Sequence, residues 1–344
     1  MQPVGQSAFT SSASDNPMHT ASHPLRSAAV MLFLGLAVLG FDTSSRAAEP
    51  TTAPHVPVGT IVQMERVPSQ YVAPHNVDVW LPPGYPKQAP YAVLYMFDGQ
   101  NLFGDHPGSK LHSWQAAATA AKFIAQGKTR PFIIVGLWNA QSLRMSEYFP
   151  QKPWESLTAA QRTLLFSRQL GDFQILPVAP YSDALLKFMT QELKPAIDHR
   201  FAVDPRQRST FVMGSSMGAL MAWYAFAEYP HTFAGAACLS THWPGPYLSL
   251  GAGVDDPAPD AFVNYIRDHF PTPAHHRIYF DHGTKTLDAW YGPIQKRVDR
   301  LLESKGWTGS HYESRVFPGA EHSEISWAAR LAIPMTFLLA PKPD

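Results

Sequence analysis

Short apolar runs that alternate with helical stretches constrain the fold of this chain most. After the first 90 residues, each run is continuous enough for a strand that is buried on both faces: YAVLYMF, PFIIVGLW, STFVMG, TFAGAACLS and HRIYF. Helices are expected between these runs and after the last of them, near 112–126, 181–200, 217–228, 258–269, 290–304 and 322–339. Strands that alternate with helices predict an α/β fold, with a mostly parallel sheet covered by helices on both faces.

Two segments depart from this alternation. Residues 60–66 and 76–82 alternate apolar and polar residues, which is typical of half-buried antiparallel strands. Residues 144–182 form an insertion of aromatic-rich sequence with one expected helix near 155–168. Because long connections in a compact domain are usually functional, we expect this insertion to be a cap that provides a wall for the substrate.

Composition excludes several classes of protein. Of the 344 residues, 45% are hydrophobic and 16% are charged, which indicates a globular chain with a large core. The 27 basic and 27 acidic residues cancel, so the chain lacks the basic surface that binding of nucleic acid or an anionic membrane requires. A small molecule is therefore the expected partner.

The N-terminus has the pattern of an export signal. An apolar run from Ala28 to Phe41 is followed by Ser45 and Ala47, small residues at the positions that precede a signal-peptide cleavage site. We expect a signal peptide at 1–47, a linker at 48–58 and one domain at 59–344, in a periplasmic or secreted protein without stable membrane insertion of the mature chain. An uncleaved anchor is the alternative, and Met18 is an alternative start of translation.

The single cysteine, Cys238, limits the chemistry further. A lone cysteine excludes an internal disulfide and a cysteine-based zinc site, and its apolar neighbours predict a buried small side chain.

The sequence GSSMG at 214–218 lies between an expected strand and an expected helix. This is the context of the G-x-S-x-G nucleophile elbow, in which the central serine occupies a strained turn and the flanking glycines let the strand and helix approach closely. That spacing selects Ser216 over Ser215 as the nucleophile. The helix that begins at Met217 directs backbone N–H groups toward negative charge near Ser216.

A serine nucleophile needs a base and an acid that orients the base. In this kind of fold the acid and then the histidine follow the serine along the chain, each on a loop after a strand. His322, after the strand in HYESRVFPG, is the expected base. Asp288 is the preferred acid, and Asp281, at the end of the preceding strand, is the alternative.

The oxyanion formed during acyl transfer needs backbone donors. The loop DGQN after YAVLYMF offers the N–H groups of Gly99 and Gln100, which are expected to act with that of Met217. Asp98 in the same loop is either a substrate contact or part of an ion pair that supports the loop.

Taken together, these segments resemble the putative esterase family of α/β-hydrolases, which includes esterase D, enterochelin esterases and feruloyl esterase modules. The resemblance runs from about Val58 to the C-terminus and rests on five segments in order: YMFDGQNLF, GSSMGAL, LSTHW, FDHGTKTLD and FPGAEHSEISW. It implies an α/β-hydrolase fold with an aromatic-rich cap and a catalytic triad of Ser216, Asp288 and His322. It also implies that Trp243 is a wall of the pocket, for which a core tryptophan is the alternative, and that Asn139 and Arg144 lie near the active site as substrate-binding candidates.

These features predict an exported serine esterase that works through an acyl-enzyme and needs no cofactor. The alternatives are an acyltransferase with the same triad, and a non-catalytic module that binds a sugar or a siderophore. A metal site is weighed at a cluster of His275, His276, Asp281 and His282. It is not expected there, because adjacent histidines on a strand point to opposite faces. The aromatic insertion favours an aryl or catecholate ester, with a simple acetyl ester as the alternative.

Overall fold

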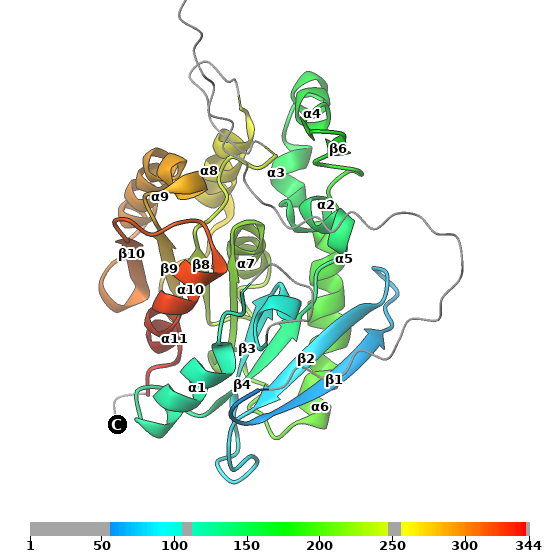
Figure 1. The fold of residues 1–344 in the computed structure, drawn as a ribbon. Helices are drawn as coiled ribbons and strands as arrows, with labels where there is room; N and C mark the ends of the chain where they lie inside the picture. The colour runs from blue at the N-terminus through cyan, green and yellow to red at the C-terminus, as the bar shows by residue number, and fades with distance from the viewer. Residues whose placement is uncertain (1–55, 105–111, 247–255, 342–344) are drawn as a thin grey trace, which may run out of the picture. The chain divides into compact units, whose positions relative to one another are not determined.

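A mostly parallel sheet forms the centre of the computed structural model, which describes residues 56–104, 112–246 and 256–341 (Figure 1). These residues lie in one compact unit, Ser44–Asp344. Within them the sheet has eight strands, in the spatial order β1 (Thr60–Val67), β2 (His75–Leu81), β4 (Phe132–Leu137), β3 (Ala92–Phe97), β7 (Thr210–Ser215), β8 (Gly235–Leu239), β9 (Arg277–His282) and β10 (Tyr312–Val316). β1 and β2 pair antiparallel with their neighbours, and all pairs from β4 to β10 are parallel. The α/β prediction is confirmed.

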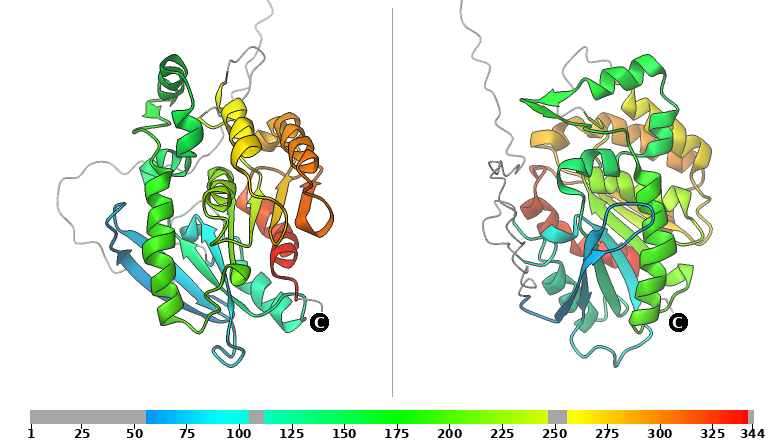
Figure 2. Two further views of the ribbon diagram at one scale, coloured as in Figure 1. Left: turned by 180° about the vertical axis from the view of Figure 1, so that it is seen from behind. Right: turned by 90° about the vertical axis from the view of Figure 1, so that its right-hand side faces the viewer.

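Helices cover both faces of the sheet (Figures 1 and 2). α7 (Met217–Glu228) packs against β7, β8 and β3, whereas α11 (Ala332–Leu339) packs against β8, β9 and α1 (Ala116–Ala125). The alternation of side chains along β3 fits these two layers. Leu94 and Met96 join the cluster that contains the buried residues of α1 and α11, and Tyr95 between them contacts Phe233.

The remaining helices outside the insertion at 144–182 follow the predicted order. They are α5 (Ser182–Lys187), η3 (Phe188–Leu193), α6 (Lys194–Arg200), α8 (Ala258–His269), α9 (Gly292–Ser304) and α10 (Glu324–Arg330). Short helical turns connect other elements: η1 (Gly99–Asn101), η2 (Gln141–Leu143), η4 (Gln207–Ser209), η5 (Thr286–Trp290) and η6 (Gly309–His311). The single helix expected near 322–339 is divided between α10 and α11, because Pro334 lacks the N–H that a continuous helix would donate to Arg330.

The insertion at 144–182 contains more structure than the one helix predicted there. α2 (Arg144–Tyr148), α3 (Gln151–Glu155) and α4 (Ala159–Phe166) are followed by a hairpin of β5 (Gln169–Leu170) and β6 (Phe173–Gln174). Figures 1 and 2 show α4 and the hairpin farthest from the sheet, beyond α2. Trp154 is buried against Phe149 and Phe166, so these rings form a core of the insertion itself.

The predicted signal peptide at 1–47 and most of the predicted linker at 48–58 lie outside the described residues. Within the described ranges, no helix has both the length and the apolar character needed to cross a membrane.

Candidate active site

Ser216 occupies a sharp turn between β7 and α7. Its backbone has φ 56° and ψ −122°, an arrangement that L-amino acids rarely adopt and that is typical of functional sites. Close packing explains the flanking glycines, because a Cβ atom on Gly214 would lie 2.3 Å from the Gly218 carbonyl oxygen. Ser215 is buried in the strand, whereas Ser216 is partly exposed. The spacing that selected Ser216 therefore corresponds to a strained elbow.

The imidazole of His322 connects Ser216 with Asp288. Ser216 Oγ lies 2.9 Å from His322 Nε2, and His322 Nδ1 lies 2.6 Å from Asp288 Oδ1. Asp288 lies in η5 after β9, and His322 follows β10, so both come from loops at the carboxyl ends of neighbouring parallel strands. The His322 backbone N–H donates to Thr286 Oγ1 at 2.8 Å, which ties the two loops together. The structure thus brings together the three side chains that the sequence selected.

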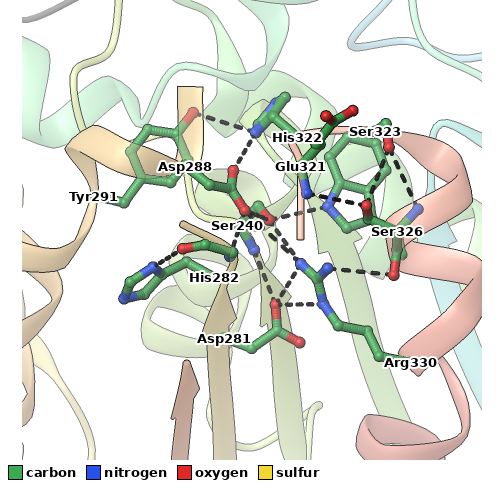
Figure 3. Close-up of polar contacts among 12 residues, drawn as sticks. Ser240, Asp281, His282, Asp288, Tyr291, Glu321, His322, Ser323, Ser326 and Arg330 are labelled. Atoms are coloured by element: carbon green, nitrogen blue, oxygen red, sulfur yellow. Dashed lines mark hydrogen bonds and ion pairs between the residues drawn. The ribbon is translucent and has the colours of Figure 1, made fainter. Parts of the chain in front are cut away.

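The Asp288 carboxylate is fully buried and well supplied with donors (Figure 3). Its Oδ2 accepts hydrogen bonds from Ser240 Oγ at 2.6 Å and from the Gly283 N–H at 2.5 Å. Burial alone would raise the pKa of Asp288, but the hydrogen bond and charge of His322, together with these two donors, lower it below its usual value. Asp288 is therefore an ionised carboxylate in the folded protein.

Asp281, the alternative acid, has different partners. It is buried on β9, where its Oδ1 accepts from Arg330 Nη2 at 3.0 Å and its Oδ2 accepts from the Tyr279 hydroxyl at 3.0 Å. Burial raises the pKa of Asp281 despite the nearby Arg330. Of the two aspartates, Asp288 is the one whose carboxylate contacts His322.

The loop after β3 lies beside the start of α7. β3 and β7 are paired with Met96 opposite Met213, so η1 and the first turn of α7 follow adjacent strands. A Cβ atom on Gly218 would lie 3.0 Å from Asp98 Oδ2, which shows how closely the two segments pack. Gly99 itself leaves no room for a side chain, since a Cβ atom there would lie 2.4 Å from the Gly136 carbonyl carbon. The backbones of Met217, Gly99 and Gln100 therefore belong to two neighbouring turns.

Asn139 and Arg144, the substrate-binding candidates, both contact Asp98. Asn139 Nδ2 donates to Asp98 Oδ1 at 2.7 Å, while Arg144 donates from Nε to Oδ1 at 2.6 Å and from Nη2 to Oδ2 at 2.7 Å. Burial lowers the pKa of Arg144, but the charge of Asp98 outweighs this effect and raises it. Of the two alternatives for Asp98, the structure has the ion pair that supports the loop.

Trp243 lies in the interior of the protein. Its side chain is 0% exposed, stacks on Trp223 and donates from Nε1 to Gln295 Oε1 at 3.0 Å. This environment corresponds to the core alternative, because a side chain without exposed surface cannot contact a substrate in this conformation.

Several residues around the triad were missed by the sequence analysis. Ser240, Tyr291, Trp327 and Arg330 are buried, and each contacts Asp288, His322 or Ser240. Of these four residues, only Ser240 could have been noted from the sequence. A polar residue directly after a buried strand lies at the edge of the sheet where binding and active sites form.

The histidines considered for a metal site have other partners. The ring of His276 contacts the Pro230 carbonyl oxygen at 2.9 Å, and His282 Nδ1 contacts the Gly283 carbonyl oxygen at 2.6 Å. No group of three or more His, Cys, Asp or Glu side chains within the described part of the chain is arranged to hold a metal ion.

Solved structures with the same fold include esterases and a serine hydrolase. A ferulic acid esterase has 15% identity and a TM-score of 0.57, over 82% of this chain and 98% of that one. An IroE-like serine hydrolase from Shewanella oneidensis has 16% identity and a TM-score of 0.57, over 81% of this chain and 79% of that one. The enterochelin esterase from Shigella flexneri has 14% identity and a TM-score of 0.55, over 83% of this chain but only 59% of that one.

A family model provides the sequence evidence. No curated protein matches the chain. Residues 171–337, which contain Ser216, Asp288 and His322, match the family described as "Putative esterase". Over these residues the chain matches the putative esterase family, and its fold is that of the α/β-hydrolases.

Proposed function

We propose that this protein is a serine esterase that hydrolyses a carboxylic ester through an acyl-enzyme. The observation that carries the proposal is the continuous hydrogen-bonded path from Ser216 Oγ through His322 to Asp288, with distances of 2.9 and 2.6 Å. The family match supports the coarser statement that the chain is a hydrolase acting on esters.

In the first half of the reaction, Ser216 Oγ attacks the carbonyl carbon of the ester while His322 Nε2 accepts the hydroxyl proton. The tetrahedral intermediate then breaks its bond to the alcohol oxygen, which takes the same proton from His322 and leaves. In the second half, water attacks the acyl-enzyme with His322 again acting as the base. The carboxylic acid is released and the proton returns to Ser216.

Asp288 fixes the protonation of the base. Its ionised carboxylate accepts the Nδ1–H of His322, which leaves Nε2 without a proton and facing Ser216. The same negative charge stabilises the imidazolium that forms after each proton transfer.

The backbone N–H groups of Met217, Gly99 and Gln100 are the proposed donors to the oxyanion. The N-terminus of the twelve-residue helix α7 adds a favourable dipole at this position. The ion pair between Asp98 and Arg144 supports the role of Gly99 and Gln100, because it anchors the residue that directly precedes them.

Substrate and location extend the proposal. Two of the similar structures are named for ferulic acid and enterochelin, so we propose an ester that carries an aryl or catecholate group as the substrate class. Turnover of feruloyl, catecholate trilactone, acetyl-xylan and p-nitrophenyl esters by the purified protein would rank these substrates.

Export to the periplasm or medium is proposed from residues 1–47. N-terminal sequencing of the protein recovered outside the cytoplasm should give Ala48 as the first residue.

The direct kinetic test replaces each of the adjacent serines. Ser216→Ala should lose almost all turnover of a short p-nitrophenyl ester, by about 10⁴-fold or more in kcat. Ser215→Ala is the matched control, since its hydroxyl lies in β7 and is buried, and it should keep most of the activity. Equal activity of the two variants would contradict the proposal.

A further inference from the structure

We propose that Ser240 is a positioning residue for the triad, which holds the Asp288 carboxylate toward His322 and separates it from Arg330. The inference rests on the proposed function, since it concerns how the acid of the triad is kept in place. Ser240 directly follows β8, is fully buried, and lies between the Asp288 carboxylate and the Arg330 guanidinium (Figure 3).

The neighbours of Ser240 fix the direction of its hydroxyl proton. Trp327 Nε1 donates to Ser240 Oγ at 3.0 Å, and Arg330 Nη2 donates to it at 2.8 Å. Indole and guanidinium groups donate hydrogen bonds but cannot accept them. Asp288 Oδ2, at 2.6 Å, is therefore the acceptor to which the Ser240 proton points.

This donor determines which oxygen of Asp288 is available to the base. Oδ2 accepts from both Ser240 and the Gly283 N–H, whereas Oδ1 accepts from His322 Nδ1. Two donors on one oxygen fix the plane of the carboxylate, so that the other oxygen faces the imidazole. Rotation of the carboxylate away from His322 would break both of these bonds.

Ser240 also takes the place of a direct hydrogen bond between Arg330 and Asp288. Arg330 Nη2 lies 3.9 Å from Asp288 Oδ2, beyond hydrogen-bond distance, and its direct carboxylate partner is Asp281. Without the Ser240 hydroxyl, the Arg330 donor would lose an acceptor and could form a direct hydrogen bond with the Asp288 carboxylate. A direct ion pair between Arg330 and Asp288 would compete with His322 for the carboxylate and reduce its effect on the imidazolium.

The backbone of Ser240 allows this hydroxyl to be removed in two ways. Ser240 has φ 46°, in the left-handed region that glycine adopts without strain. Ser240→Gly therefore removes the hydroxyl and relieves backbone strain, while Ser240→Ala removes the hydroxyl and keeps the Cβ atom. A purely structural role would change the stability of these two variants by different amounts, because they differ in strain and packing, and would leave the activity per folded molecule at the wild-type value.

The experiment measures kcat and KM for an ester that the wild-type protein hydrolyses, with the concentration of reactive sites determined by titration with a fluorophosphonate. We expect Ser240→Ala and Ser240→Gly each to lower kcat by about 10- to 100-fold. KM should change little, because His322 acts in both formation and hydrolysis of the acyl-enzyme. The far-downfield proton resonance of the His322 Nδ1–H should shift or broaden in both variants.

Tyr279→Phe is the matched control. It removes a hydroxyl of the same buried network that donates to Asp281 at 3.0 Å rather than to Asp288. We expect its kcat and its downfield resonance to equal those of the wild-type protein. Wild-type kcat with an unchanged resonance in both Ser240 variants would overturn the proposal, as would an equal loss of kcat in Tyr279→Phe. Failure of the proposed function is a separate result, namely a wild-type protein that neither turns over esters nor reacts with the fluorophosphonate at Ser216.

Discussion

Arg144 forms two parallel hydrogen bonds with Asp98, from Nε at 2.6 Å and from Nη2 at 2.7 Å, and thereby holds the residue that begins the turn Gly99–Asn101. Paired contacts of this kind fix orientation as well as distance, and a lysine cannot reproduce them. Asp98 itself has φ 59°, so the turn depends on contacts of its side chain to keep its shape.

Replacement of Arg144 by lysine tests whether this residue holds the loop or binds the substrate. We expect Arg144→Lys to lower kcat for a neutral ester by about tenfold or more, because the backbone donors at Gly99 and Gln100 lose their position. A substrate-binding role would instead raise KM for anionic esters and leave neutral esters unaffected. Steady-state kinetics with one neutral and one anionic ester separates the two outcomes.

The two aspartates of the site should respond differently to the same substitution. Asp288→Asn should lower kcat by about 10³- to 10⁴-fold while the protein stays folded, since an amide cannot hold the required tautomer of His322. Asp281→Asn should mainly destabilise the fold, by about 3–5 kcal/mol, because Arg330 keeps a buried charge without its anionic partner. Urea unfolding and kcat, measured for both variants, would show the reverse pattern if Asp281 were the acid.

A buried histidine far from the triad in sequence should make stability depend on pH. His75 Nδ1 lies 2.6 Å from the Ala73 carbonyl oxygen, and its Nε2 lies 2.7 Å from Glu147 Oε1. Both ring nitrogens face acceptors, which favours the doubly protonated form of the imidazole. Burial lowers the pKa of His75, but the hydrogen bond and charge of Glu147 outweigh burial and raise it above 6.5.

The raised pKa of His75 sets the sign of the effect. The folded state binds the proton more tightly than the unfolded state, so the stabilisation is fully present below about pH 6.5 and is lost as the pH rises through the folded pKa. The difference in unfolding free energy between the wild-type protein and His75→Gln should therefore be larger at pH 6 than at pH 9. A difference that grows with rising pH would contradict this assignment.

Glycine at position 214 should be essential for folding of the elbow. Gly214→Ala places a Cβ atom 2.3 Å from the Gly218 carbonyl oxygen, so α7 must move away from β7. We expect this variant to be insoluble or inactive. Gly292→Ala is the control, because the nearest atom to its Cβ, His282 Cε1, lies at an ordinary contact distance of 3.5 Å. Circular dichroism and esterase activity of both variants would test the difference.

The sheet and the elbow could be predicted because local patterns determine them. Continuous apolar runs such as that of β3 occur where a strand is covered on both faces, and the bounds predicted for α7 and α8 are those of the structure. Ser216, Asp288 and His322 could be selected together because the sheet is parallel in this part. It places the ends of β7, β9 and β10, which these residues follow, at one edge.

The directions of individual side chains could not be predicted in the same way. Arg144 and Trp243 were selected as substrate-binding candidates from the sequence, but whether a side chain points to a substrate, to Asp98 or into the core depends on tertiary packing. The choice between Asp281 and Asp288 was open for the same reason, since Arg330, which neutralises Asp281, comes from a helix 49 positions further along the chain. The aromatic residues of the insertion were expected to face a substrate, yet Trp154 packs within the insertion.

The most direct test of the account is to locate the covalent adduct that forms during the reaction. Brief treatment with a fluorophosphonate or a slowly hydrolysed ester, followed by intact-mass measurement and peptide mapping, should give one adduct per chain, on Ser216. The Ser215→Ala protein should give the same adduct, and the Ser216→Ala protein should give none. Ester turnover without an adduct, or with an adduct on another residue, would contradict the assignment of Ser216 as the nucleophile.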